Sequence, residues 1–110
     1  MKLIFDWDDA KAHRNRIKHK VSFDEARSIF GDRFLVTFPD EKHSQVEDRF
    51  ISIGTSSKNR VILVVHTEYD EDDAIIIIRF INARKATPAE REVYEKAKDR
   101  KRNGRNASRI

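Results

Sequence analysis

A stripe of basic residues near the N-terminus has the spacing needed to bind phosphate groups. Lys11, Arg14 and Lys18 follow one another at intervals of three and four residues, so they share one face of a helix. Asn15 lies at the edge of this stripe, and His19 follows Lys18. Such a row of donors suits a phosphate backbone, and an ordinary solvated helix face is the alternative.

Two arginines stand in an apolar segment near residue 80. Ala74–Arg84 contains four consecutive isoleucines, which favours a strand through β-branching. Strict alternation puts Arg79 on one face of this strand, together with Ile77 and Ile81, and Arg84 on the opposite face. A buried guanidinium needs a carboxylate, carbonyl or ligand partner, because its unpaired charge is costly. The two arginines therefore indicate either structural salt bridges or bidentate phosphate binding.

One histidine lies on an apolar strand with a carboxylate two positions away. His66 shares its expected face with Val64 and Glu68. A histidine beside a carboxylate can act as a general acid or base near neutral pH, whereas a satisfied core histidine is the structural alternative. Arg49 shares a face with Ile51 in another predicted strand, and the same two interpretations apply to it.

The sequence lacks the motifs of most cofactor-binding and metal-binding sites. The chain has no cysteine, and its glycines are isolated, so neither thiolate ligation nor a phosphate-binding glycine loop is indicated. The histidines at 13, 19, 43 and 66 have no metal-site spacing. We therefore expect no metal and no cofactor. Cleavage of RNA needs neither, because the 2′-hydroxyl is the nucleophile and the protein supplies a base, an acid and positive charge.

Three segments that must position these residues have the caps of helices. Each follows a Ser, Thr or Asp, and two have a Glu three residues further on, as in a capping box. In the last, Pro88 takes the first helical position, and Ala89, Val93 and Ala97 form the expected apolar face. The predicted helices cover Asp9–Lys20 after Asp8, Phe23–Phe30 after Ser22 with Glu25, and Pro88 to about Lys98 after Thr87 with Glu90.

Five segments have the alternation or β-branching of strands. They are joined by short connections, which favours antiparallel neighbours. The order of elements predicts an α+β domain in which helices cover a mostly antiparallel sheet. The predicted strands are Lys2–Trp7, Phe34–Phe38, Glu47–Gly54, Arg60–Tyr69, which we expect at the centre, and Ala74–Arg84.

Length and charge fit one small domain with a basic tail. The chain has 110 residues and a net charge of +4, but residues 1–99 hold 18 basic and 19 acidic side chains. The excess comes from five basic residues between Arg100 and Arg109. We predict a single domain over residues 1–98 and a flexible basic tail over 99–110. No secretory signal and no apolar run long enough for a bilayer is visible, so we expect a cytoplasmic protein without membrane contact.

Four segments, in register over about residues 1–95, resemble the BrnT family of toxins. The first contains the Lys, Asn and Lys-His pattern followed by V-S-F-D-E-A. The others contain D-R-F-I-S-I-G, V-V-H-T-E and R-F-I-N-A-R-K-A-T-P. The segments are Asp8–Phe30, His43–Gly54, Val64–Glu68 and Arg79–Glu95.

The resemblance implies a fold, an activity and a partner. The fold would be RelE-like, with two N-terminal helices and a C-terminal helix packed on the sheet. The activity would be a metal-independent endoribonuclease that cleaves RNA and inhibits translation. The partner would be a cognate BrnA-like antitoxin with a ribbon-helix-helix module, through which the pair would reach DNA indirectly.

The resemblance also implies a set of site residues. Arg79 or Arg84 would hold the scissile phosphate, Lys18 would offset its developing charge, and His19 or His66 would move protons. If RNA is the substrate, the basic stripe of Lys11, Arg14 and Lys18, predicted from helical spacing, would contact it. The implied catalytic set is Lys18, His19, Arg49, His66, Arg79 and Arg84.

Two positions depart from the family pattern, and two other functions stay open. Lys20 stands where the family frequently has glycine, and Asn82 stands where it commonly has serine. The first alternative function is a nucleic-acid-binding or ribosome-binding module that does not cleave. The second is a partner-binding protein without nuclease activity, in which the arginines form structural salt bridges.

Overall fold

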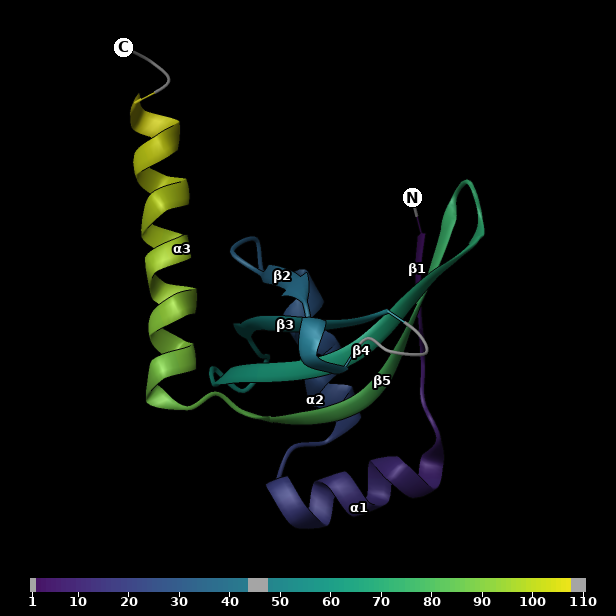
Figure 1. Ribbon diagram of the computed structural model, residues 1–110. Coiled ribbons are helices and arrows are strands. Elements are labelled where there is room, and N and C mark those ends of the chain that lie inside the picture. The colour runs from purple at the N-terminus through teal and green to yellow at the C-terminus, as the bar shows by residue number, and fades with distance from the viewer. Residues whose placement is uncertain (1, 44–47, 108–110) are drawn as a thin grey trace.

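The computed structural model describes residues 2–43 and 48–107 and consists of one five-stranded sheet with helices on both faces (Figure 1). Part of the His43–Gly54 segment, residues 44–47, lies outside the described residues. None of the described helices is long and apolar enough to cross a membrane. The elements are β1 (Lys2–Asp6), α1 (Asp9–His19), α2 (Phe23–Ser28), η1 (Ile29–Gly31), β2 (Val36–Pro39), η2 (Glu41–His43), β3 (Arg49–Thr55), β4 (Val61–Asp72), β5 (Ile75–Lys85) and α3 (Pro88–Ala107).

The sheet is mixed, with strand order β1-β5-β4-β3-β2. The β2–β3, β3–β4 and β4–β5 pairs are antiparallel, and β4 lies at the centre as predicted. The first strand differs from expectation because β1 pairs with β5 in parallel, Lys2 opposite Ile75 and Asp6 opposite Arg79. A parallel pairing needs a long crossover, and here the whole chain from α1 to β4 provides it.

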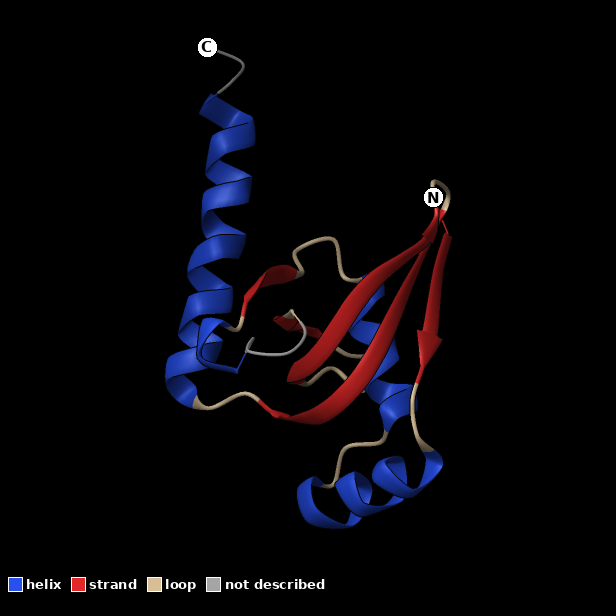
Figure 2. Ribbon diagram, turned by 45° about the vertical axis from the view of Figure 1, so that its right-hand side comes forward, coloured by secondary structure: helices blue, strands red, loops and turns tan. Residues whose placement is uncertain are grey.

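Helices lie on both sides of the sheet (Figure 2), and each face has its own core. On one face, which we call the α1/α2 face, residues of both helices pack around Phe23, Ile62 and Phe80. The opposite face, which we call the α3 face, has a smaller core of Ile53, Leu63 and Tyr94. Packing on both faces of the sheet therefore positions the side chains that belong to these cores.

Helix α3 differs from the sequence prediction in its buried face and its length. Tyr94 is 1% exposed, whereas Val93, on the predicted apolar face, is 49% exposed. The Tyr94 hydroxyl donates to Asp32 and also contacts the Thr55 hydroxyl. Tyr94, and not the predicted stripe of Ala and Val residues, therefore determines which face of α3 is buried. The helix continues to Ala107 instead of ending near Lys98. Its start is as predicted, because Thr87 and Glu90 form both hydrogen bonds of the capping box.

Asn15 ties α1 to the part of β5 that β1 leaves uncovered. Its side-chain amide donates to the carbonyl of Ala83 at 2.8 Å and accepts from the Ala83 N–H at 3.1 Å. The same amide donates to the carbonyl of Val21 at 2.9 Å. Asn15 thus makes the paired contacts of a neighbouring strand and satisfies backbone groups that would otherwise be buried without partners.

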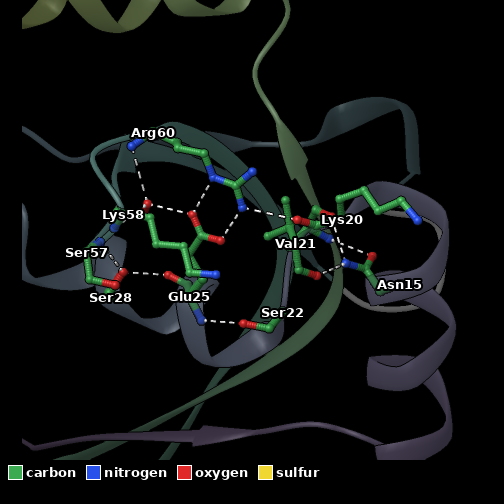
Figure 3. Close-up of polar contacts among 11 residues, drawn as sticks. Asn15, Lys20, Val21, Ser22, Glu25, Ser28, Ser57, Lys58 and Arg60 are labelled. Atoms are coloured by element: carbon green, nitrogen blue, oxygen red, sulfur yellow. Dashed lines mark hydrogen bonds and ion pairs between the residues drawn. The ribbon is translucent and has the colours of Figure 1, made fainter.

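A second polar cluster joins α2 to the turn between β3 and β4 (Figure 3). Ser22 caps α2 as predicted, with its hydroxyl accepting from the Glu25 N–H. The Glu25 carboxylate does not complete the capping box; it accepts from the Arg60 guanidinium and the Ser56 hydroxyl instead. Arg60 also donates to the carbonyl of Lys20. Glu25 is 3% exposed, and Arg60, through its hydrogen bond, does most to lower the pKa of this carboxyl.

A bulge at Ile81 changes which residues of β5 share a face. Val65 lies opposite Asn82, but His66 lies opposite Phe80, so Ile81 is the extra residue. Strict alternation fails beyond this point, and Ala83 joins Phe80 in the core of the α1/α2 face. The predicted separation of Arg79 from Arg84 onto opposite faces is therefore wrong.

Replacing Arg60 should destabilise the fold because it leaves a buried carboxylate without its charged partner. We expect Arg60→Ala to lower the free energy of unfolding by about 3 kcal/mol, measured by urea denaturation at pH 7. Arg60→Lys should lower it by less, because a positive charge remains near the carboxylate. Since the pKa of Glu25 is lowered in the folded state, the wild type should lose this contribution as the pH falls below the ordinary carboxyl range.

The matched control is Lys58→Ala, an exposed position in the same turn. It should change stability by less than about 0.5 kcal/mol. If Arg60→Ala unfolded at the same urea concentration as Lys58→Ala, the pair would not hold α2 to this turn.

Candidate functional site

The basic stripe of α1 lines a groove of about 360 Å³ against β5. All three basic residues of the stripe lie in it, and so does His19. The opposite wall comes from β5 at the bulge, where β1 has ended. The lining residues are Lys11, Arg14, Asn15, Lys18, His19, Ile81 and Asn82.

The ends of α1 determine where the groove begins and stops. Asp8 accepts from the Lys11 N–H at the first turn, and Asn15 holds the middle of the helix to β5. Lys20 ends the helix with φ 60°, a left-handed conformation that favours glycine. This left-handed conformation explains why glycine is frequent at this position in the family that the sequence resembles. It also turns the chain toward α2 directly after His19.

His19 is the histidine of the groove, and its surroundings favour the neutral ring. Burial lowers its pKa, and the positive charges of Lys18 and Arg84 lower it further. A neutral imidazole near pH 7 can accept a proton. The same neighbouring cations can meanwhile hold an anion beside the ring.

Asn82 also lines the β5 wall of the groove, although it was not among the site residues predicted from the sequence. Its Oδ1 is buried and has no hydrogen-bond partner within the described part of the chain. A buried acceptor without a donor costs about 1–3 kcal/mol. The only sequence signal was the departure from serine at this position.

Three arginines of the predicted site share the α3 face. Arg49 lies opposite Thr67, and Thr67 lies opposite Arg79, so the two arginines belong to one row of residues across β3, β4 and β5. Arg84 lies opposite Leu63. Because Leu63 and Thr67 are an even number of residues apart on β4, their cross-strand partners face the same way. The bulge thus brings together arginines that alternation would separate.

Arg79 and Arg84 are both ion-paired, as the structural interpretation expects. Arg79 pairs with Asp6, and both side chains are nearly half exposed, so the pair is worth at most about 1 kcal/mol. Arg84 makes a bidentate pair with Glu90, at 2.6 and 2.8 Å, where α3 begins. That pair lowers the pKa of Glu90 to about 2. Neither Asp6 nor Glu90 was predicted from the sequence as a partner of these arginines.

His66 lies on the predicted face but is fully buried. Its Nε2 is 2.7 Å from Ser52 Oγ, which is 2.7 Å from Thr37 Oγ1. The Glu68 carboxylate is 3.7 Å from Nδ1. The ring contacts Phe30 and Phe50, and burial lowers its pKa to about 4. His66 is thus in the interior, away from the groove.

The predicted set therefore divides into three parts. The α1 residues gather in the groove, the arginines share the α3 face, and His66 belongs to the core. Arg84 connects the arginines of the α3 face with the groove, because its positive charge helps to lower the pKa of His19. Among the described residues, no three His, Asp or Glu side chains come together as metal ligands would.

Comparison with known proteins identifies a family for most of the chain. Residues 7–90 match the family model described as the ribonuclease toxin BrnT of type II toxin–antitoxin systems. The crystal structure of the Brucella abortus ribonuclease toxin BrnT aligns with a TM-score of 0.56 at 21% sequence identity. That alignment covers 79% of this chain and 99% of the Brucella chain, which supports the α+β fold. No curated protein sequence matches significantly.

His66 should make stability depend on pH. Its folded pKa of about 4 lies below the ordinary 6.5, so the unfolded chain binds a proton first as the pH falls. The free energy of unfolding should be highest above pH 6.5 and fall by about 3 kcal/mol on the way to pH 4. Urea denaturation at several pH values measures this. His66→Gln, which has no titrating ring, should remove that slope even if it lowers stability at pH 7, and an unchanged slope would contradict the assignment.

His19 should titrate below the ordinary histidine range. Lys18→Gln should raise its pKa part of the way back, because burial, the largest cause, remains. Titration of the ring signals by NMR measures the shift. Lys11→Gln is the matched control: it also removes one charge from α1, but Lys11 is not among the causes of the shift. Equal effects of both substitutions would show that general charge, and not the neighbouring lysine, sets the pKa.

Proposed function

This chain belongs to the BrnT family of ribonuclease toxins of type II toxin–antitoxin systems, and from that premise we propose that it cleaves RNA in the groove between α1 and β5. One observation supports this location above the others. Lys11, Arg14 and Lys18 line the same groove as His19, whose lowered pKa favours a ring able to accept a proton. Phosphate-binding and proton-accepting groups therefore face one space.

In the proposed reaction the RNA supplies its own nucleophile. The neutral His19 ring takes the proton of a 2′-hydroxyl, whose oxygen forms a bond to the adjacent phosphorus. The bond from phosphorus to the 5′-oxygen breaks, and the imidazolium returns its proton to that oxygen. Lys18 and Arg14 offset the negative charge on the phosphoryl oxygens as it develops. The products are a 2′,3′-cyclic phosphate and a 5′-hydroxyl.

The arginines of the α3 face take different roles in this proposal. Arg79 can exchange Asp6 for a phosphate, because the exposed pair is weak. Arg84 acts as a positioning residue: Glu90 holds it at the start of α3, and its charge helps to keep His19 neutral. Arg49 shares the row of Arg79 and would contact the same RNA backbone. His66 would support the core and would not carry protons.

The family membership also supports finer proposals about regulation. We expect the cleavage to be independent of metal, to inhibit translation in the cytoplasm, and to be neutralised by a BrnA-like ribbon-helix-helix antitoxin that reaches DNA. We also assign the fold to the RelE-like group. A partner-binding protein without nuclease activity is the second candidate function, because Arg79 and Arg84 are both ion-paired, as a structural role for them predicts.

Cleavage by the purified protein tests the proposal. The wild type should cut single-stranded RNA in the presence of EDTA and leave fragments that end in 2′,3′-cyclic phosphate. His19→Gln should lower the rate about 100-fold or more, and Lys18→Gln should lower it by a smaller factor. His13→Gln is the matched control, because His13 is an exposed histidine of the same helix outside the groove.

Each outcome separates the candidate functions. Equal rates for the His19 and His13 variants would move the proton transfer elsewhere. A folded wild type that binds RNA and leaves it intact would favour the binding module. A folded wild type that neither binds nor cleaves would favour the partner-binding protein.

A further inference from the structure

Four basic side chains surround Phe34 on the α3 face, away from the groove. The charged groups of Arg33, Lys98 and Arg102 lie 5.1, 5.4 and 5.2 Å from the centre of its ring. Lys101 donates to the carbonyl of Leu35 at 3.2 Å. We call these four basic residues and Phe34 the Phe34 cluster. Cations over an aromatic face are individually favourable, but four of them in one place repel one another.

No ion pair within the described residues joins these four cations to a carboxylate. Asp32 is close enough for Lys98 to lower its pKa, yet its oxygens already accept from Tyr94, Thr55 and Phe34. The described part of the protein therefore leaves most of the positive charge of the cluster without an ion-pair partner. An external polyanion would neutralise it and would release counterions on binding.

The shape of the molecule presents this charge to a large ligand. The C-terminal half of α3 extends past β2 and away from the sheet (Figures 1 and 2), and Arg33, Lys101 and Arg102 are exposed. Phe34 packs with the core of the α3 face, whereas α1 packs with the other core. A short oligonucleotide in the α1 groove would not reach the Phe34 cluster.

We propose that the Phe34 cluster is a second RNA-binding site, which holds the sugar-phosphate backbone of a long RNA while another part of that RNA occupies the α1 groove. This inference rests on the proposed function, since it takes RNA as the ligand. The long side chains of Lys98 and Arg102 supply the phosphate contacts.

Binding of uncleavable RNA tests this site without relying on catalysis. The ligand is a 2′-O-methyl oligonucleotide of about 16 nucleotides, compared with one of about four. Lys98→Gln/Arg102→Gln should weaken binding of the long RNA roughly tenfold at moderate salt. The salt dependence of that binding should become shallower by about 0.7 for each phosphate that the variant no longer neutralises. Binding of the short RNA should stay at the wild-type level, and circular dichroism should show an intact fold.

Arg91→Gln/Lys96→Gln is the matched control, because it removes the same charge from exposed positions of the same helix. It should bind both RNAs like the wild type. Equal binding by the two double variants would overturn the proposal, and the cations would then only shield Phe34. Failure of the wild type to cleave natural RNA would count against the proposed function alone, since the oligonucleotide comparison would still decide this site.

Discussion

The amide of Asn15 makes the contact on which the arrangement of the groove depends. Strand β1 ends at Asp6, so β5 beyond Arg79 has an edge without a partner strand. Asn15 bonds both backbone groups of Ala83 there and also reaches Val21. A helix side chain thereby completes a sheet, and the helix that carries it is held against β5. The basic stripe on that helix faces the strand because Asn15 itself must point inward.

The bulge at Ile81 is the second constraint, and it acts on the opposite face. One extra residue in β5 lets Phe80 and Ala83 both enter the core, and it turns Arg84 to the face of Arg79. The same irregularity leaves Asn82 at the wall of the groove. Asn15 and the bulge therefore act at neighbouring positions, and together they bring residues of α1 and β5 around one space.

Most of the helices and strands could be predicted from local sequence patterns. Features that depend on contacts between residues distant in sequence could not. Asp8, Ser22 and Thr87 cap helices through neighbours three residues away, so a short stretch of sequence contains the whole interaction. The partner of Glu25 is Arg60, and the capping pattern did not indicate it. The bulge is equally hidden, because it exists only in the pairing of β5 with β4. Tyr94 determines the buried face of α3 because its hydroxyl bonds Asp32 and Thr55, both far from it in sequence.

The two candidate histidines show why residue type and spacing could not identify the site alone. Burial is the largest cause of the lowered pKa of both histidines, but the neighbouring cations Lys18 and Arg84 add to the shift of His19 alone. The hydrogen bonds of His66 to Ser52, and of Ser52 to Thr37, connect β4, β3 and β2. Arg49 stands on β3 beside the residue paired with His66. Loss of activity on replacing His66 would therefore be explained by displacement of β3, and only a variant that keeps the fold can identify a group that moves protons.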